Sequence, residues 1–152
     1  MREAEILGLL NHPHIISLHY FSHTSISWPL YLEHAGSTTL SQYISQWGPT
    51  NALAQSHSGR CLNEEEGRRF ARQIGSALRY CHLNCVHHSS LCSDKIIVTQ
   101  IGDVKITGFG STQLISGIYD QSFDTFSYGT IVWHMLCGTV PWHVGENWDR
   151  YD

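Results

Sequence analysis

The spacing of hydrophobic positions along the chain predicts four helices. Residues 2–10 form the first, and Pro13 closes it, because proline disfavours helical geometry in the residue before it. Residues 40–47 form a second, shorter helix after a polar break at 37–39. The apolar face of the first helix carries Ile6, Leu7, Leu9 and Leu10.

The two remaining helices are longer. Asn63 can cap one of them, and Glu66, three residues later, completes a box-like pair. Nearly every position from 123 to 136 is apolar, which predicts a helix buried on all sides in the middle of a domain. The apolar stripe of the helix after Asn63 carries Phe70, Ile74, Leu78 and Cys81, at spacings of four and three.

Short runs of β-branched and aromatic residues predict strands between the helices. Residues 15–21 and 28–34 are two of them. Residues 96–98 and 104–106 flank a turn at Gly102, which predicts a hairpin. Together, the helices and strands predict an α+β fold.

Composition narrows the class of protein. The chain has 152 residues, of which 41% are hydrophobic and 14% charged, which is typical of one globular domain. The net charge is −4 and there is no Lys/Arg run, so we expect no nucleic-acid partner. There is no apolar stretch of about 18 residues, so we expect no membrane span. The odd number of cysteines, five, without a signal-like start favours reduced thiols and a cytoplasmic, intracellular location.

Eleven histidines raise the question of a metal site. Residues 81–88, which hold two cysteines and three histidines, are the place to expect one. Their spacing does not match a common zinc pattern, and no second Cys/His pair follows at the usual distance. We therefore expect scattered structural histidines and no metal ligand.

Three blocks of sequence resemble the eukaryotic Ser/Thr protein kinases, from the helix that this family calls C onward. Residues 2–16, with Glu3 and the His12-Pro13 pair, resemble helix C and the strand after it. Residues 70–82 resemble helix E, and residues 124–142 resemble helix F and its exit. The blocks are most similar to the microtubule-affinity-regulating kinases and the fungal polarity kinases, within the calmodulin-dependent and AMP-activated kinase group.

The resemblance implies a partial protein-kinase-like fold, mostly the helical large lobe with helix C and remnant strands of the small lobe. Residues 1–35 would be the small-lobe remnant and hinge, and residues 36–152 the truncated large lobe. Residues 48–62 would be a polar loop insertion. We expect the glycine-rich loop, the strand lysine, the substrate-docking tripeptide and the last large-lobe helices of the family to be missing.

The polar positions of the kinase site are replaced. The family's catalytic loop has an aspartate as base, a lysine two residues on, and a metal-binding asparagine three further. Here these are Ser90, Cys92 and Lys95, and Gly108 stands where the metal-binding aspartate of Asp-Phe-Gly belongs. Glu3 matches the helix C glutamate, and without its lysine we expect a solvated carboxylate. The same solvated state is expected of Asp94.

Scaffold positions match the family better. Four of them correspond to the apolar stack that links the lobes, and a fifth to the helix F aspartate that anchors it. Glu33 and Ala35 lie in a stretch that resembles the hinge receiving adenine. The five scaffold positions are Leu7, Leu18, His88, Phe109 and Asp124.

Three functions remain open at this point. The first is a catalytically inactive pseudokinase remnant that acts as a binding or scaffold module for a protein partner, with no cofactor. The second is an active Ser/Thr kinase that uses ATP and magnesium, as the family implies. The third is a non-functional truncated gene product. Because strands near helix C would lack sheet partners, we also expect an exposed apolar face.

Overall fold

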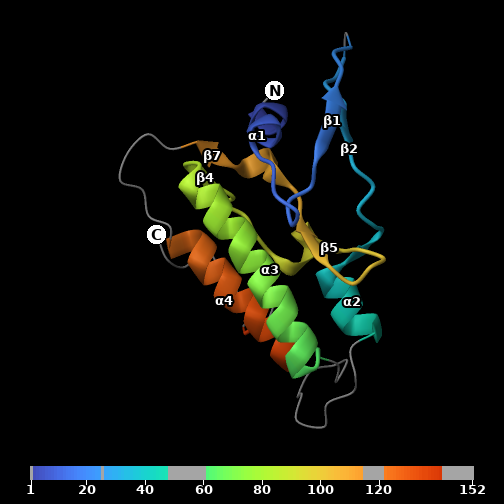
Figure 1. The fold of residues 1–152 in the computed structure, drawn as a ribbon, viewed down its shortest axis with the longest axis vertical. Helices are drawn as coiled ribbons and strands as arrows, with labels where there is room; N and C mark the ends of the chain where they lie inside the picture. Colours follow the sequence, from blue (N-terminus) through green and yellow to red (C-terminus); the bar gives the residue numbers. More distant parts are fainter. Residues whose placement is uncertain (1, 25, 48–60, 115–121, 142–152) are drawn as a thin grey trace.

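The computed structural model describes residues 2–24, 26–47, 61–114 and 122–141. Within these ranges helices alternate with short strands, so the fold is α+β, as predicted. Figure 1 shows two long helices side by side, with a two-stranded ribbon standing away from them. None of the described helices has the length and apolarity to cross a membrane.

All four predicted helices are present. The predicted cap of the third is confirmed: the side chain of Asn63 accepts a hydrogen bond from the backbone N–H of Glu66 at 2.9 Å. The carboxylate of Glu66 accepts a hydrogen bond from the Tyr43 hydroxyl at 2.7 Å, which ties the third helix to the second. The helices are α1 (Arg2–Leu9), α2 (Leu40–Trp47), α3 (Glu64–Leu83) and α4 (Ser122–Cys137), with two short 3-10 turns, η1 (Ser93–Lys95) and η2 (Phe109–Ser111).

Within the described residues, the strands form three small antiparallel sheets. The predicted hairpin around Gly102 is confirmed, and this glycine has a φ of 81°, a left-handed conformation that glycine adopts at low cost. β1 (Leu18–Phe21) pairs with β2 (Leu30–Leu32), β4 (Val86–His87) pairs with β7 (Gln113–Leu114), and β5 (Ile96–Val98) lies between β3 (Thr38–Thr39) and β6 (Val104–Ile106).

β1 is shorter than predicted because its first residues pair elsewhere. The N–H of Ile16 donates to the carbonyl of Ile106 at 2.8 Å, and Ile15 forms a parallel bridge with the same residue of β6. The segment at 15–16 therefore joins the β5–β6 hairpin to α1. The break predicted at 37–39 was also wrong in part, since β3 lies there and pairs with β5.

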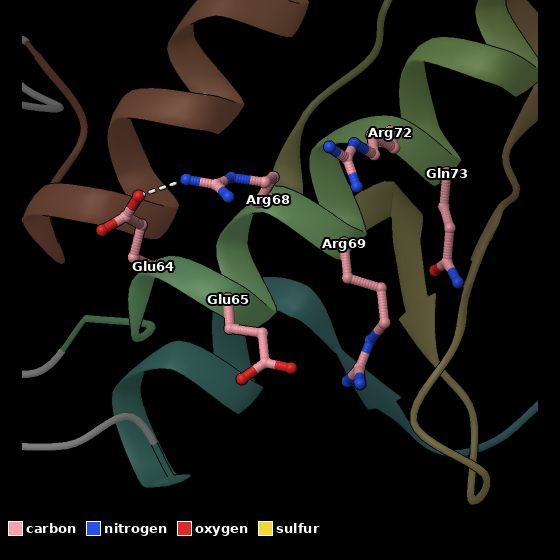
Figure 2. A pocket seen from close by; sticks show the side chains of 6 residues that line it. All are labelled: Glu64, Glu65, Arg68, Arg69, Arg72 and Gln73. Atoms are coloured by element: carbon pink, nitrogen blue, oxygen red, sulfur yellow. Dashed lines mark hydrogen bonds and ion pairs between the residues drawn. The ribbon is translucent and has the colours of Figure 1, made fainter.

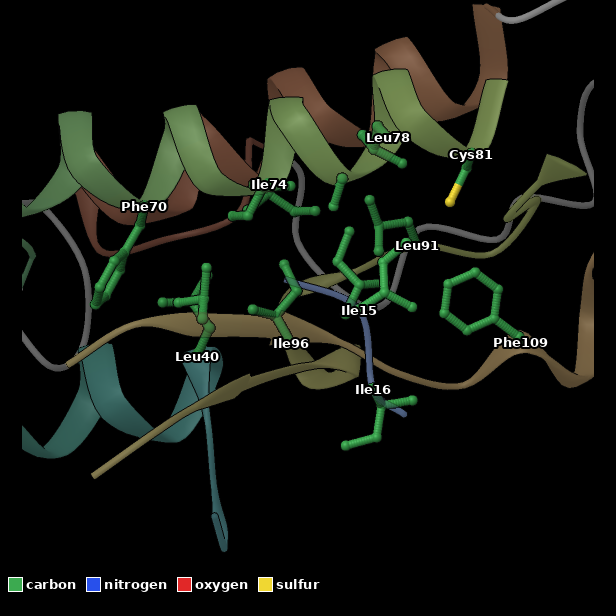
Figure 3. Packing of buried hydrophobic residues seen from close by; sticks show 14 of the residues in the cluster. Ile15, Ile16, Leu40, Phe70, Ile74, Leu78, Cys81, Leu91, Ile96 and Phe109 are labelled. Atoms are coloured by element: carbon green, nitrogen blue, oxygen red, sulfur yellow. The ribbon is translucent and has the colours of Figure 1, made fainter. Parts of the chain in front are cut away.

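One hydrophobic core holds these elements together. It lies between α3 and the β5–β6 hairpin (Figure 3), and Ile6 and Leu7 of α1 belong to it as well. The predicted stripe of α3 faces it, and each of its four side chains is at most 5% exposed. The deepest members of the core are Ile6, Ile15, Leu40, Phe70, Ile74, Ile96, Ile106, Phe109 and Met135.

Two expectations about burial were wrong. α4 is not buried on all sides: Phe123 is 70% exposed and Trp133 is 50% exposed, while Ile131 and Met135 face the core. Within the described residues α4 is covered chiefly on the side that packs against α3, so its other apolar face remains open. On α1, Leu9 is likewise 64% exposed.

A polar loop was expected at 48–62, and residues 48–60 of it lie outside the described residues. Its last two residues were predicted wrongly, because Cys61 and Leu62 are 5% and 3% exposed. The N–H of Leu62 donates to the carbonyl of Met135 at 2.7 Å, which ties this segment to α4. The proposed boundary between residues 35 and 36 stays a prediction.

Candidate functional site

Asp124, in the first turn of α4, anchors the segment that matches the kinase catalytic loop. Its side chain is 2% exposed and accepts hydrogen bonds from the backbone N–H groups of His88 and Ser89, both at 2.9 Å. The ring of His82 lies 2.9 Å from the same carboxylate. Ser89 has a φ of 63°, which is unfavourable for a residue with a side chain, and its hydrogen bond to Asp124 holds it there.

The charge of Asp124 follows from these contacts. Burial alone would raise the pKa of this carboxyl, but hydrogen bonds from His82, Ser89 and His88 outweigh it and lower the pKa. Asp124 is therefore an ionised carboxylate at neutral pH. Since a carboxylate can only accept, Nε2 of His82 carries the hydrogen in their bond.

The rings of His88 and Phe109 pack against each other in a tilted arrangement next to this anchor. Both are fully buried, and their ring centroids are 4.8 Å apart. Nε2 of His88 donates to the carbonyl of Thr107 at 3.0 Å. Burial is the main cause that lowers the pKa of His88, so the ring is neutral at pH 7.

The other two positions of the predicted stack lie nearby in the fold. Leu7 of α1 is 2% exposed and belongs to the same core as Phe109. Leu18 of β1 is half-buried and packs against the edge of this core. α1 itself packs against both η2 and β1, so the structure brings all four predicted residues to one region.

The replaced catalytic positions also converge, on the side chain of Lys95. Its Nζ donates a hydrogen bond to Oγ of Ser90 at 2.5 Å. Its aliphatic stem lies over Gly108, where a Cβ would meet Cδ and Cγ of Lys95 at 3.1 and 3.3 Å. Lys95 therefore fills the space between the positions of the family's base and its metal-binding aspartate. Cys92, the fourth replaced position, is exposed.

This donor set does not fit magnesium. Magnesium takes oxygen ligands, normally including one or two carboxylates, in a near-octahedral arrangement. Ser90 offers a neutral hydroxyl, Gly108 offers no side chain, and Lys95 adds a positive charge at their centre. A second cation would be repelled from this position.

The nearest candidates for a substitute carboxylate lie outside this cluster. Asp94 is exposed, as predicted. Glu3 is half-buried rather than solvated, which corrects the expectation: its Oε2 lies 3.2 Å from the position of a Cβ on Gly110. α1 thus places Glu3 over η2, yet no ion pair joins it to Lys95, and both residues are described.

The hinge-like stretch is fixed by Glu33. Its carboxylate accepts hydrogen bonds from the N–H of Ser17 and from Nζ of Lys105, each at 2.7 Å. Burial raises the pKa of Glu33, but the contacts with Lys105 and Ser17 outweigh it, so the net effect is a lowered pKa. These bonds join the end of β2 to β6, and Ala35 packs against the core beside them.

The surface hollow along α3 has the wrong lining for a nucleotide base. Five of the six side chains around it are charged and the sixth is an amide (Figure 2). Sites for small molecules with aromatic rings are mostly apolar. None of the replaced catalytic positions lines it. The six residues are Glu64, Glu65, Arg68, Arg69, Arg72 and Gln73.

The sequence analysis missed one polar cluster. His82, His87 and Asp124 place one donor atom each within 4.8 Å of one another. The two histidines stand five residues apart within the segment that was considered for a metal site, but Asp124 follows 37 residues after His87. Only the packing of α3 against α4 brings the carboxylate to them, and the sequence carries no local signal for it.

The comparisons with known proteins agree with the resemblance. A family model described as "Protein kinase domain" matches residues 1–118. "NUAK family SNF1-like kinase 2" of Rattus norvegicus is 32% identical over 163 residues, which cover 92% of this chain and 24% of the relative. "Protein kinase kin1" of Schizosaccharomyces pombe is 28% identical over 164 residues, covering 93% of this chain and 17% of the relative.

A third relative comes from another lineage. "Probable serine/threonine-protein kinase MARK-C" of Dictyostelium discoideum is 29% identical over 165 residues, which cover 93% of this chain and 20% of the relative. The predicted similarity to the microtubule-affinity-regulating and fungal polarity kinases is therefore confirmed. The chain spans about a quarter of the length of the first curated relatives that it matches.

Proposed function

This chain belongs to the protein kinase domain family, and we propose that it is a catalytically inactive member that acts by binding another protein. The observation that carries the proposal is the convergence of Lys95, Ser90 and Gly108. A protein kinase accelerates phosphoryl transfer by positioning and by neutralising charge with metal ions. In this chain the ammonium group of Lys95 stands at a position that the resemblance assigns to a metal ligand, which supports the proposal.

The loss of the base supports the same proposal. General acid–base assistance is typically worth about 10²–10⁴-fold in rate. The Ser90 hydroxyl has no basicity near neutral pH, and it already accepts a hydrogen bond from Lys95. Neither proton abstraction nor metal binding therefore has a side chain to perform it at these positions.

The binding role rests on what the fold keeps and exposes. The contacts of Asp124, His88 and Phe109 preserve the frame of the site without its chemistry. Apolar side chains are exposed in two separate places, on α4 and on the β1–β2 ribbon, and exposed apolar surface that forms a contiguous patch commonly marks a protein interface. These side chains are Tyr20, Phe21, Tyr31, Phe123, Phe126, Trp133 and Leu136. The five free cysteines support a reducing, cytoplasmic setting for this partner.

An active Ser/Thr kinase is the second candidate, because the relatives carry that name. In an active kinase, ATP and magnesium would have to act at a site formed by Ser90, Lys95 and Gly108, none of which carries a carboxylate. A phosphoryl-transfer assay distinguishes an active kinase from the inactive protein proposed above.

The test is phosphoryl transfer by the purified chain, measured with labelled ATP and either magnesium or manganese. We expect no incorporation into the chain itself or into a basic protein substrate above that of a heat-denatured sample. The matched variant is Lys95→Met, which removes the ammonium group but keeps the stem over Gly108. Metal-dependent transfer by the wild-type chain that changes in Lys95→Met would overturn the proposal.

A further inference from the structure

A second cluster of polar side chains includes the anchor Asp124 and two histidines. His82 comes from the last turn of α3, His87 from β4 and Asp124 from the first turn of α4. Nε2 of His82 lies 2.9 Å from Oδ2 of Asp124, and the rings of His82 and His87 stack with centroids 4.9 Å apart. We propose that these three side chains bind one divalent transition-metal ion, with zinc as the first choice.

The donor set matches the chemistry of such an ion. Zinc in proteins takes imidazole nitrogens and carboxylate oxygens, and a common arrangement has three protein ligands and one position open to water. Tetrahedral zinc with bonds of about 2.0–2.1 Å sets its donors about 3.3 Å apart. The three donor atoms here all lie within 4.8 Å of one another, and the closest pair of atoms named above is at 2.9 Å. Closing the site would therefore need the donors to approach by about an ångström and the stacked rings of His82 and His87 to turn, so that one nitrogen of each points at the ion.

Burial and backbone hydrogen bonds hold the three side chains in place. The side chain of Asp124 is 2% exposed, that of His82 is 13% exposed, and His87 is buried. Backbone N–H groups of His88 and Ser89 fix the plane of the carboxylate. Outer hydrogen bonds of this kind orient metal ligands and strengthen binding.

A surface hollow reaches one of the three donor residues, His82. A hollow of about 350 Å³ runs between α3 and α4, and His82 lines it together with Thr125, Tyr128 and Arg79. Two neutral imidazoles and one carboxylate carry a charge of −1, so a divalent ion leaves the site at +1. When Nε2 of His82 binds the ion, the hydrogen of its bond to Asp124 moves to Nδ1 of the same ring, so the imidazole stays neutral. The positive charge of Arg79 opposes the ion, so we expect moderate rather than tight binding.

This proposal revises the expectation that the chain has no metal ligand. The sequence analysis looked for a Cys/His pattern within residues 81–88, and the structure selects only two histidines from that segment. Cys81 is fully buried and is not part of the group of donors that lie close together. The site is also separate from the Lys95 cluster, so it does not depend on whether the chain transfers phosphate.

The test uses cobalt(II) as a spectroscopic probe and zinc as its competitor on the full chain. We expect one cobalt ion per chain, with absorption from nitrogen and oxygen ligands and without a thiolate charge-transfer band. We expect zinc to displace the cobalt. His87→Gln should lower the affinity by at least about tenfold, because it removes a direct ligand. His19→Gln, at an exposed position of β1, is the matched control and should bind as the wild type does.

Circular dichroism decides whether His87→Gln has kept its fold. If it has not, the wild-type chain still gives an answer, because paramagnetic cobalt should broaden the NMR signals of residues 82, 87 and 124 before those of the other histidines. A thiolate band, equal loss of binding in His19→Gln, or broadening centred on other residues would overturn the proposal. So would the absence of a stoichiometric complex.

Discussion

Two halves of the same site have had different fates in this chain. Around Asp124, each side-chain oxygen accepts at least one backbone hydrogen bond, and His88 and Phe109 are fully buried. Around Lys95, the residues are half-buried or exposed, and none of Ser90, Cys92 or Gly108 has the side chain that phosphoryl transfer requires. The residues that hold the backbone are tightly packed, whereas the positions that the resemblance assigns to catalysis carry no carboxylate or metal-binding side chain.

The comparison shows that stability and catalysis make separate demands on one loop. The backbone from His88 to Ser90 needs Asp124 to hold the strained φ of Ser89. It does not need an aspartate at position 90 in order to fold. If the chain is inactive, as proposed above, it is a kinase-like domain that keeps its shape without its chemistry.

The largest effect should follow from the buried stack. Phe109→Ala removes a fully buried aromatic ring that contacts His88, so we expect a loss of about 3–5 kcal/mol in the free energy of unfolding. Phe123→Ala is the matched control, because Phe123 is 70% exposed, and it should cost less than about 1 kcal/mol. Urea unfolding followed by circular dichroism measures both. Equal costs would show that Phe109 is not part of a packed core.

Asp124→Asn should have the next largest effect. The amide keeps the shape but presents one oxygen to three donors, so a buried N–H loses its acceptor and about 1–3 kcal/mol is lost. Asp94→Asn, at an exposed position of η1, should stay within about 0.5 kcal/mol of the wild type. The same urea experiment checks the pair, and an unchanged Asp124→Asn variant would refute the anchor.

Acidic pH should lower the free energy of unfolding through the buried ring of His88. Burial lowers the pKa of His88 below its ordinary value of 6.5, so the unfolded chain binds more protons than the folded chain as the pH falls through that value. Stability is therefore full above pH 6.5 and falls below it, by at most about 1.4 kcal/mol per pH unit from this ring.

Melting temperatures between pH 8 and pH 5 measure this slope. His12 and His134, whose pKa values are also lowered chiefly by burial, add to it in the same direction. His88→Phe should flatten the profile, and His19→Gln should leave it unchanged. A melting temperature that rises on acidification would contradict the neutral state of His88.

The smallest change in stability should come from a substitution at Lys95. Lys95→Met loses a half-buried hydrogen bond to Ser90 but keeps the stem that covers Gly108, so we expect a change within about 0.5 kcal/mol. Thermal unfolding next to the wild type is the measurement. A loss of more than about 2 kcal/mol would mean that Lys95 has become a structural residue in its own right.

Much of this fold could be predicted from the sequence. The stripe of Phe70, Ile74, Leu78 and Cys81 has one helical period, so it placed α3 correctly against the core. The family resemblance placed Asp124 and the replaced positions in order along the chain. The sequence pattern did not predict the strands β3, β4 and β7. β3 is only two residues long, and β4 pairs with β7 across more than twenty residues, so neither leaves a local signal.

The apolar run of α4 misled for a different reason. Its composition predicted burial on all sides, but burial depends on how many elements pack around a helix. Likewise, the sequence could name Ser90, Lys95 and Gly108 as replacements without showing that they touch. The contacts of the Lys95 side chain with Ser90 and Gly108 depend on how the chain folds, and no local pattern in the sequence indicates them.

The most direct measurement is a calorimetric titration of magnesium-ATP into the purified chain, beside Lys95→Met. The account predicts no saturable, magnesium-dependent heat with the wild type, because the ammonium group of Lys95 lies at the metal position and Gly108 offers no ligand. Saturable binding that requires magnesium, with one nucleotide per chain, would contradict the claim that this site has lost its chemistry.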